Sequence, residues 1–243
     1  CLDEHLARLY RGAERIELKV PIAKKEFGEA ICETLRANNL RNGYVRPVVT
    51  RGPGDLGLNP LSCPKPTVFI IADVLTLYPE AFYKKGMDVM ICETRRNLPR
   101  AIPPEIKSLN YLNSILARLE VNKRGLGEGI FLTEEGHIAE GTADNLFAVR
   151  KGSLETPPVS LGALPGITRG VVIEIARSMG IEVAETRFLP DDLAKAEECF
   201  LTGTGAEIVP VRSLDGHKIG KGKPGPVTER LRKAFLEETR KRG

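Results

Sequence analysis

Apolar residues recur at helical spacing in some stretches of the chain and cluster in short runs elsewhere. Phe27, Ile31 and Leu35 lie on one face of a helix, which predicts that residues 23–38 are helical. Short runs rich in β-branched residues, bounded by glycine or proline, predict strands. The expected helices cover residues 2–9, 23–38, 110–122, 168–179, 191–196 and 226–240, and the expected strands cover residues 44–50, 67–72, 88–92, 129–133, 137–139, 145–150, 181–186, 199–202 and 207–211.

Helical and strand patterns are mixed along the chain, and no internal repeat is present. Prolines at positions 99, 103 and 104 interrupt the pattern, and proline is unfavourable inside helices and central strands. We therefore expect an α+β fold of two lobes, with a small domain over residues 1–98, a connector over 99–105 and a large domain over 106–243.

The composition is that of an ordinary globular protein, with 42% hydrophobic and 28% charged residues. The net charge is only +4, and the basic residues are scattered except near the C-terminus. Aromatic residues, on which single-stranded nucleic acids stack, make up 5% of the chain and include no tryptophan. No apolar run approaches the roughly 18 residues of a membrane span. We therefore expect neither a nucleic acid nor a membrane as a partner.

Cysteine and histidine are few and widely spaced. The number of cysteines is odd and no CxxC pair occurs, which argues against a disulfide framework and suits a reducing cytoplasm. The histidines lack the spacing of metal ligands, so no metal site is expected. These residues are Cys1, Cys32, Cys63, Cys92, Cys199, His5, His137 and His217.

Two charged residues are candidates for chemistry. Lys107 follows the proline-rich connector, where the pattern predicts that it opens a helix. A lysine is ordinarily a solvated surface residue, but burial lowers its pKa and frees the amine to attack carbonyl groups. Glu140 ends a strand-like run, and its ordinary interpretation is a turn carboxylate. Asp144 and Asn145 suit the same turn, in which Asn145 can cap backbone groups.

Two glycine-containing segments are candidates for anion binding. Residues 163–168 lead into the helix expected at 168–179, where backbone N–H groups and the Thr168 hydroxyl can hold a phosphate. Residues 201–206 form a second loop of small residues. Neither segment matches the Walker or GxGxxG patterns, and taken alone each is more simply a structural turn.

Four segments, taken in order, resemble the class IV (fold type IV) aminotransferases, which use pyridoxal 5′-phosphate. These segments are IKSLNYLNSILA at 106–117, IAEGTADNLF at 138–147, GALPGITR at 162–169 and TGTGAEIVP at 202–210, and the resemblance extends to GPVT at 225–228. It therefore covers nearly the whole chain. The fold implied is the two-lobed α+β fold of the D-amino-acid and branched-chain aminotransferases. In that family a strand-rich segment of the small domain precedes Arg8, and we expect this segment to be missing here.

The resemblance implies roles for individual residues. Lys107 matches the lysine that holds the cofactor as a Schiff base and carries the proton between substrate and cofactor. Glu140 matches the carboxylate that keeps the pyridine nitrogen protonated. The other implied cofactor contacts are Arg8, Ile167, Thr168 and Thr204 at the phosphate, Leu164 against the ring, Tyr111 at the cofactor O3′, and Asn145. The implied substrate contacts are Arg46 and the backbone amides of Gly205 and Ala206.

Within the family, the 202–207 loop and Tyr111 are most similar to branched-chain L-amino-acid aminotransferases, with leucine, isoleucine or valine and 2-oxoglutarate as substrates. A D-amino-acid aminotransferase and an aminodeoxychorismate lyase stay open, because the KSLN string at Lys107 also occurs in them. A catalytically silent binding or assembly module is the alternative from another class. The family also implies a homodimer or homohexamer.

Overall fold

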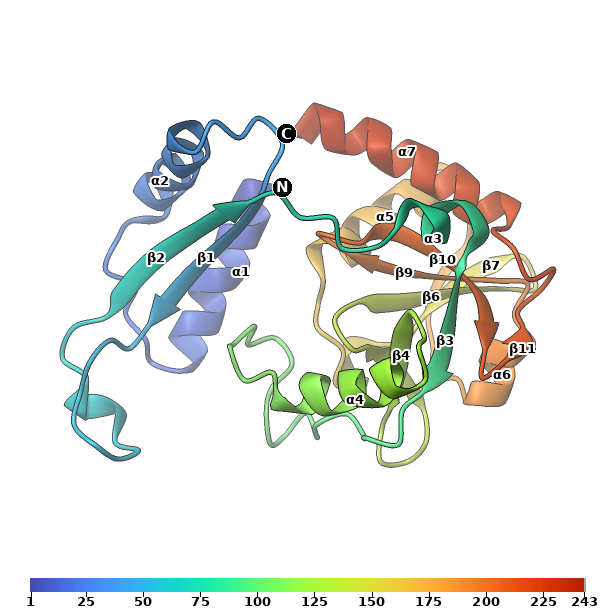
Figure 1. Ribbon diagram of the computed structural model, residues 1–243, viewed down its shortest axis with the longest axis horizontal. Helices are drawn as coiled ribbons and strands as arrows, with labels where there is room; N and C mark the ends of the chain where they lie inside the picture. Colours follow the sequence, from blue (N-terminus) through green and yellow to red (C-terminus); the bar gives the residue numbers. More distant parts are fainter. Residues whose placement is uncertain (243) are drawn as a thin grey trace. The chain divides into compact units, whose positions relative to one another are not determined.

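The computed structural model describes residues 1–242, and these fall into two compact units that divide between Thr76 and Leu77 (Figure 1). Each unit has its own sheet and its own hydrophobic core. Gly243, the last residue of the predicted large domain, lies outside the described residues.

The first unit packs two helices on a two-stranded antiparallel sheet. Leu6, Phe27 and Ile31 form its buried core, and Tyr44 pairs with Asp73 at one end of the sheet. The first helix is longer than expected, because apolar spacing is lost after Leu9 although Gly12 and Ala13 are still buried. The elements are α1 (Leu2–Arg15), α2 (Lys24–Ala37), β1 (Tyr44–Thr50), η1 (Pro60–Ser62) and β2 (Thr67–Asp73).

The second unit contains a nine-stranded mixed sheet in the order β5-β4-β3-β10-β9-β6-β7-β8, with β11 paired to β10. Its elements are α3 (Glu80–Lys85), β3 (Met87–Ile91), α4 (Leu112–Lys123), β4 (Glu128–Leu132), β5 (Ile138–Gly141), β6 (Asn145–Arg150), β7 (Ser153–Thr156), η2 (Val159–Leu161), α5 (Ile167–Ser178), β8 (Val183–Glu185), α6 (Pro190–Ala194), β9 (Glu198–Gly203), β10 (Glu207–Leu214), β11 (His217–Lys218) and α7 (Pro226–Arg242).

Strand β3 belongs to this second sheet, although the sequence pattern grouped it with the small domain. It pairs in parallel with β10 on one side and with β4 on the other. The expected connector, residues 99–105, therefore lies inside the second unit and not at its edge. The prolines do mark an irregular segment, but the partners of β3 are distant in sequence, and no local pattern reveals them.

Buried side chains from the strands form the main core of the second unit, and helices cover the sheet. Val89, Ile130 and Leu201 are among its fully buried residues. Helices α5 and α7 pack on β9, as Figure 1 shows, while α4 packs on β4. Phe147 and Phe200 face each other across β6 and β9 with ring centroids 5.1 Å apart. This framework brings the ends of β5, β6 and β9 close to the start of α5.

Candidate active site

Glu140, near the end of β5, is buried and held by three donors. The Arg96 guanidinium lies 2.9 Å from its Oε1, the Leu164 backbone N–H donates to Oε2 at 2.9 Å, and the Asn145 amide donates to Oε2 at 3.4 Å. Burial raises the pKa of the Glu140 carboxyl, while the charge of Arg96 and the bond from Leu164 oppose that rise. A buried carboxylate with a paired cation and amide donors can face a further cationic group.

Asn145 begins β6 and links Glu140 to the segment that precedes α5. Its side-chain nitrogen also donates to the Leu164 carbonyl at 2.9 Å. Its Oδ1 lies so close to Gly166 that a Cβ there would overlap with it. Gly166 is the N-cap of α5, so Asn145 sets the approach of this helix terminus to Glu140.

Lys107 lies in an irregular segment, five residues before α4 begins at Leu112. The expectation that Lys107 opens this helix is therefore wrong, because short turns, such as the one that Tyr111 N–H closes on Leu109 O, occupy residues 106–111. Its side chain is exposed, and Nζ lies 5.9 Å from the centre of the half-exposed Tyr111 ring. The Lys107 charge is near enough to lower the pKa of Glu140, against the dominant effect of burial.

The start of α5 offers donors to an anion. Its N-cap is Gly166, without a side-chain cap, and Thr168 in its first turn is buried. Thr202 is the cross-strand neighbour of Asn145, so the two side chains lie on one face of the sheet. Within residues 1–242, the buried Thr202 hydroxyl has no hydrogen-bond partner. The donors at the start of α5 suit a phosphate, and the Glu140 carboxylate suits a basic ring nitrogen. The two features together fit a ligand that carries both groups.

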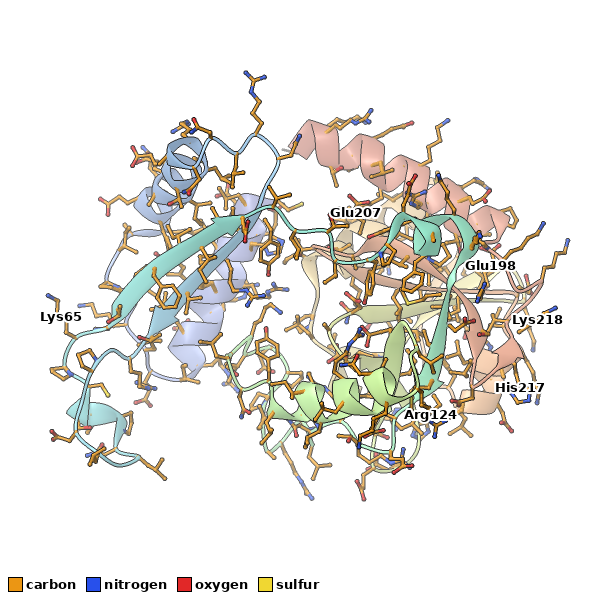
Figure 2. All side chains as sticks on the ribbon, viewed as in Figure 1. Lys65, Arg124, Glu198, Glu207, His217 and Lys218 are labelled. Atoms are coloured by element: carbon orange, nitrogen blue, oxygen red, sulfur yellow. The ribbon has the colours of Figure 1, made fainter. Side chains whose placement is uncertain are left out.

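The β9–β10 hairpin carries the second small-residue loop. Gly203 pairs with Glu207, so Thr204, Gly205 and Ala206 form the turn between them. Ala206 is buried, and its carbonyl accepts a hydrogen bond from the Tyr83 hydroxyl at 3.1 Å. Glu207, labelled at the end of this hairpin in Figure 2, has a φ of 57°, which is uncommon for a residue other than glycine. Thr204 is exposed.

Two of the expected site residues belong to the first unit. Arg8 is buried on α1. Arg46 is exposed on β1, where its guanidinium lies over the Tyr44 ring and donates to the Tyr44 hydroxyl at 3.2 Å and 3.3 Å. The residues that the structure brings together around Glu140 are those of the second unit.

Several residues of this region were missed by the sequence analysis. Arg96, which pairs with Glu140, lies in an irregular segment without any motif of its own. Tyr78 was not singled out either, yet its hydroxyl lies 2.8 Å from both Glu128 and Asp144. This arginine and this tyrosine meet their buried carboxyl partners only through tertiary contacts, so no local signal identifies them.

The part of the chain that the structure describes contains no group of three or more acidic, cysteine or histidine side chains that can hold a metal ion. None of the helices in residues 1–242 is both long and apolar enough to cross a membrane.

Comparison with known proteins shows the same similarity in sequence and in structure. The family model of class IV amino-transferases matches residues 1–214. A putative branched-chain-amino-acid aminotransferase of Methanocaldococcus jannaschii is 45% identical over 236 residues, which cover 97% of this chain and 81% of that protein. The Escherichia coli branched-chain amino acid aminotransferase superposes with a TM-score of 0.94 at 39% identity, over 97% of this chain and 78% of that chain. A branched-chain amino acid aminotransferase of Thermobaculum terrenum, in its pyridoxal-phosphate form, superposes with a TM-score of 0.90 at 34% identity, over 100% of this chain and 79% of that chain.

Proposed function

Since the chain belongs to the class IV aminotransferase family, we propose that it transfers the amino group of leucine, isoleucine or valine to 2-oxoglutarate. Its cofactor is pyridoxal 5′-phosphate. The observation that carries the proposal is the buried Glu140 carboxylate, which Arg96 and Leu164 hold within the electrostatic reach of Lys107. The similarity to branched-chain enzymes supports the substrate class, and a solved relative complexed with N-(5′-phosphopyridoxyl)-L-glutamate supports 2-oxoglutarate as the acceptor.

Glu140 serves as the partner of the cofactor's ring nitrogen. The cofactor, when bound, would supply a protonated ring that can take up the electron pair left on the substrate Cα after loss of its proton. The negative charge of Glu140 favours the protonated nitrogen, and the charge of the Arg96 guanidinium opposes the rise in the Glu140 pKa that burial causes. Asn145 and the Leu164 amide fix the direction of its second oxygen, and the Leu164 side chain would pack against the ring.

Lys107 serves as the covalent attachment point and as the acid–base group. Its Nζ would take the proton from the substrate Cα and deliver it to the cofactor carbon that is bonded to the transferred nitrogen. Because the Lys107 side chain is long and exposed, it can reach both positions by changing its rotamer. Tyr111, whose ring centre lies 5.9 Å from Nζ, would donate to the cofactor O3′.

The phosphate is held at the start of α5. The backbone N–H groups of Ile167 and Thr168 point away from the helix body, where the helix dipole favours negative charge. For Thr204 and Arg8, a role at the phosphate rests on the resemblance to the family.

The amino acid is held through its α-carboxylate. We assign the backbone amides of Gly205 and Ala206, in the turn of the β9–β10 hairpin, to this group. A substrate role for Arg46 rests on the resemblance to the family. Because Ala206 is buried and its carbonyl is fixed by Tyr83, the amides keep their direction when no substrate is bound.

Absorbance and turnover of the purified protein, loaded with pyridoxal phosphate, test the proposal. L-leucine should remove the visible absorbance of the bound cofactor, and 2-oxoglutarate should then be converted to glutamate. A response to D-alanine alone would indicate a D-amino-acid aminotransferase. No cofactor absorbance after loading would indicate a silent binding module.

Replacement of the attachment lysine sharpens this test. Lys107→Ala should abolish turnover and the absorbance band of the Schiff base with the protein, because the amine that forms this Schiff base is removed. Lys123→Ala, which removes an exposed lysine from the end of α4, is the matched control and should leave both unchanged. Full activity of Lys107→Ala would contradict the assignment.

We expect the protein to act as a homodimer or homohexamer in the cytoplasm. Support for self-association comes from α4, whose residues Leu112, Ile115, Leu116 and Leu119 form one helical face that is 46–63% exposed. Support for a reducing compartment comes from the five cysteines, which are all free thiols.

A further inference from the structure

Three buried side chains next to the candidate site form a hydrogen-bonded chain that the proposed chemistry does not use. The Tyr78 hydroxyl lies 2.8 Å from Glu128 Oε2 and 2.8 Å from Asp144 Oδ2. A tyrosine hydroxyl has one hydrogen and can donate it to only one of the two carboxyl groups. The other carboxyl must therefore carry a proton of its own, which it donates to the tyrosine oxygen.

The surroundings of Glu128 identify it as the ionised member of the pair. Its Oε1 accepts from the Gly129 N–H at 2.8 Å, from the Thr142 N–H at 3.3 Å and from the Thr142 hydroxyl. The Arg118 guanidinium lies 3.6 Å from its Oε2. Three donors and a cation stabilise a carboxylate, so the Tyr78 hydrogen points to Glu128.

Asp144 is then the acid that keeps its proton. Burial raises the pKa of its carboxyl to about 7, and the negative charge of Glu128 adds to the rise. The charged and titratable groups around Asp144 are Glu128 on β4, Glu140 on β5, Lys107 before α4, Tyr78 before α3 and Tyr83 on α3. Of these only Lys107 favours the ionised form by its charge.

The second oxygen of Asp144 contacts the hairpin loop. Asp144 Oδ1 lies against Gly203, so close that a Cβ at this glycine would overlap with it. Gly203 is the last residue of β9, directly before the Thr204–Gly205–Ala206 turn. Asp144 also precedes Asn145, which contacts Glu140 and Leu164. It therefore lies between the acid that faces the cofactor ring and the loop that faces the substrate.

We propose that Asp144 is a positioning residue which, as an uncharged acid, seats the Gly203–Ala206 loop for binding a substrate carboxylate. The proposal rests on the proposed function, in which the amides of Gly205 and Ala206 hold that carboxylate. An ionised Asp144 loses its hydrogen bond to Tyr78 and places a negative charge against Gly203. Affinity for amino acids and 2-oxo acids then falls as the pH rises, while proton transfer at Lys107 is less affected.

The test compares the wild type with Asp144→Asn, whose amide reproduces the shape and the donor of the neutral acid. In the wild type, the ¹³C signal of the Asp144 carboxyl and the amide signals of Gly203, Gly205 and Ala206 should titrate together near pH 7. The KM for leucine and for 2-oxoglutarate should rise over the same range, with a smaller change in kcat. In Asp144→Asn the loop signals and KM should lose this titration step. Asp191→Asn, at an exposed acid in α6, should keep the wild-type behaviour.

Two outcomes would overturn the proposal. One is a loop titration that is the same in Asp144→Asn as in the wild type. The other is an Asp144 carboxyl that titrates at the ordinary value of an aspartate. If Asp144→Asn does not fold, Tyr78→Phe is the second variant, because it removes the oxygen that accepts the Asp144 proton. An unchanged pH midpoint of the loop amide signals in Tyr78→Phe would contradict the proposal. The spectra need no turnover, so a titrating loop without transamination supports the role of Asp144 and overturns only the proposed function.

Discussion

Glu140 and Asp144 are buried carboxyl groups four positions apart, yet their neighbours favour opposite protonation states. Glu140 is paired with Arg96 and accepts from two N–H groups, which favours the ion. Asp144 shares Tyr78 with the ionised Glu128, which favours the neutral acid. Burial raises the pKa of both groups, but the Arg96 charge and the Leu164 N–H oppose the rise at Glu140, whereas the Glu128 charge adds to the rise at Asp144. In the proposed function, this difference would suit a cationic ring nitrogen at Glu140 and an anionic substrate group at the Gly203–Ala206 loop.

The Arg96–Glu140 pair carries a prediction at this scale. In Arg96→Gln, Glu140 loses the cation that opposes the effect of burial, so its pKa rises further. A larger fraction of the Glu140 carboxyl is then neutral at pH 7. We expect kcat/KM to fall, by about tenfold for each 1.4 kcal/mol of transition-state stabilisation that is lost. Activity of the variant should recover as the pH rises through the raised pKa of Glu140. A pH profile of kcat/KM with leucine measures both effects.

Arg150→Gln is the matched control for this change. Arg150 is a partly buried arginine that pairs with Glu155 at 3.0 Å and Asp192 at 3.3 Å, on elements away from Glu140. Its loss should leave the pH profile of kcat/KM unchanged. Equal profiles for Arg96→Gln and the wild type would show that Glu140 does not depend on its guanidinium.

The first turn of helix α7 is capped by Glu198, a residue of strand β9. The Glu198 carboxylate accepts from the Val227 N–H at 3.0 Å, the Thr228 N–H at 2.7 Å and the Thr228 hydroxyl at 2.6 Å. Figure 2 labels Glu198 near the end where α7 begins. Gly225 has no Cβ, and one would overlap with the Glu198 side chain. The Gly225–Thr228 string is therefore the docking site for this carboxylate.

Removal of the cap should weaken the second unit. Glu198→Ala leaves the first N–H groups of α7 without their acceptor, and a charged cap contributes about 1–2 kcal/mol. The melting temperature should fall by about 2–4 °C for each kcal/mol. Glu237→Ala, which removes an exposed acid later in α7, should leave the melting temperature within error of the wild type. A loss no larger in Glu198→Ala than in this control would rule out the cap.

Most helices and strands could be predicted from the sequence, but not which of them lie next to each other in the fold. Strands β1 and β6 have the expected bounds, and α5 is shifted by a single residue, because local apolar patterns determine them. Helix α3 and strand β7 were not expected, since each is short and has few apolar positions. The four motifs locate the Glu140 turn and the β9–β10 loop, but not Arg96, whose role comes from a contact 44 residues away.

At the scale of the whole molecule, the sequence predicts the helix at residues 110–122, observed as α4, but not which of its faces is covered. Ala117 and Val121 face the core with Phe131, whereas the larger Leu112 and Leu116 are exposed. Small residues allow close packing of the helix on the sheet, so the larger side chains are left on the outer face. Such a face is suited to a second copy of the chain.

The exposed α4 face therefore gives a prediction about assembly. The double variant Leu112→Arg/Leu116→Arg places two like charges on that face, and these repel a second copy and are costly to bury. We expect the wild type to sediment as a dimer or hexamer and the variant as a smaller species, with its far-UV circular dichroism unchanged. Leu189→Arg, at an exposed leucine before α6, should keep the wild-type mass. A variant that sediments with the wild type would mean that the copies meet elsewhere, and a monomeric wild type would remove the proposal of self-association.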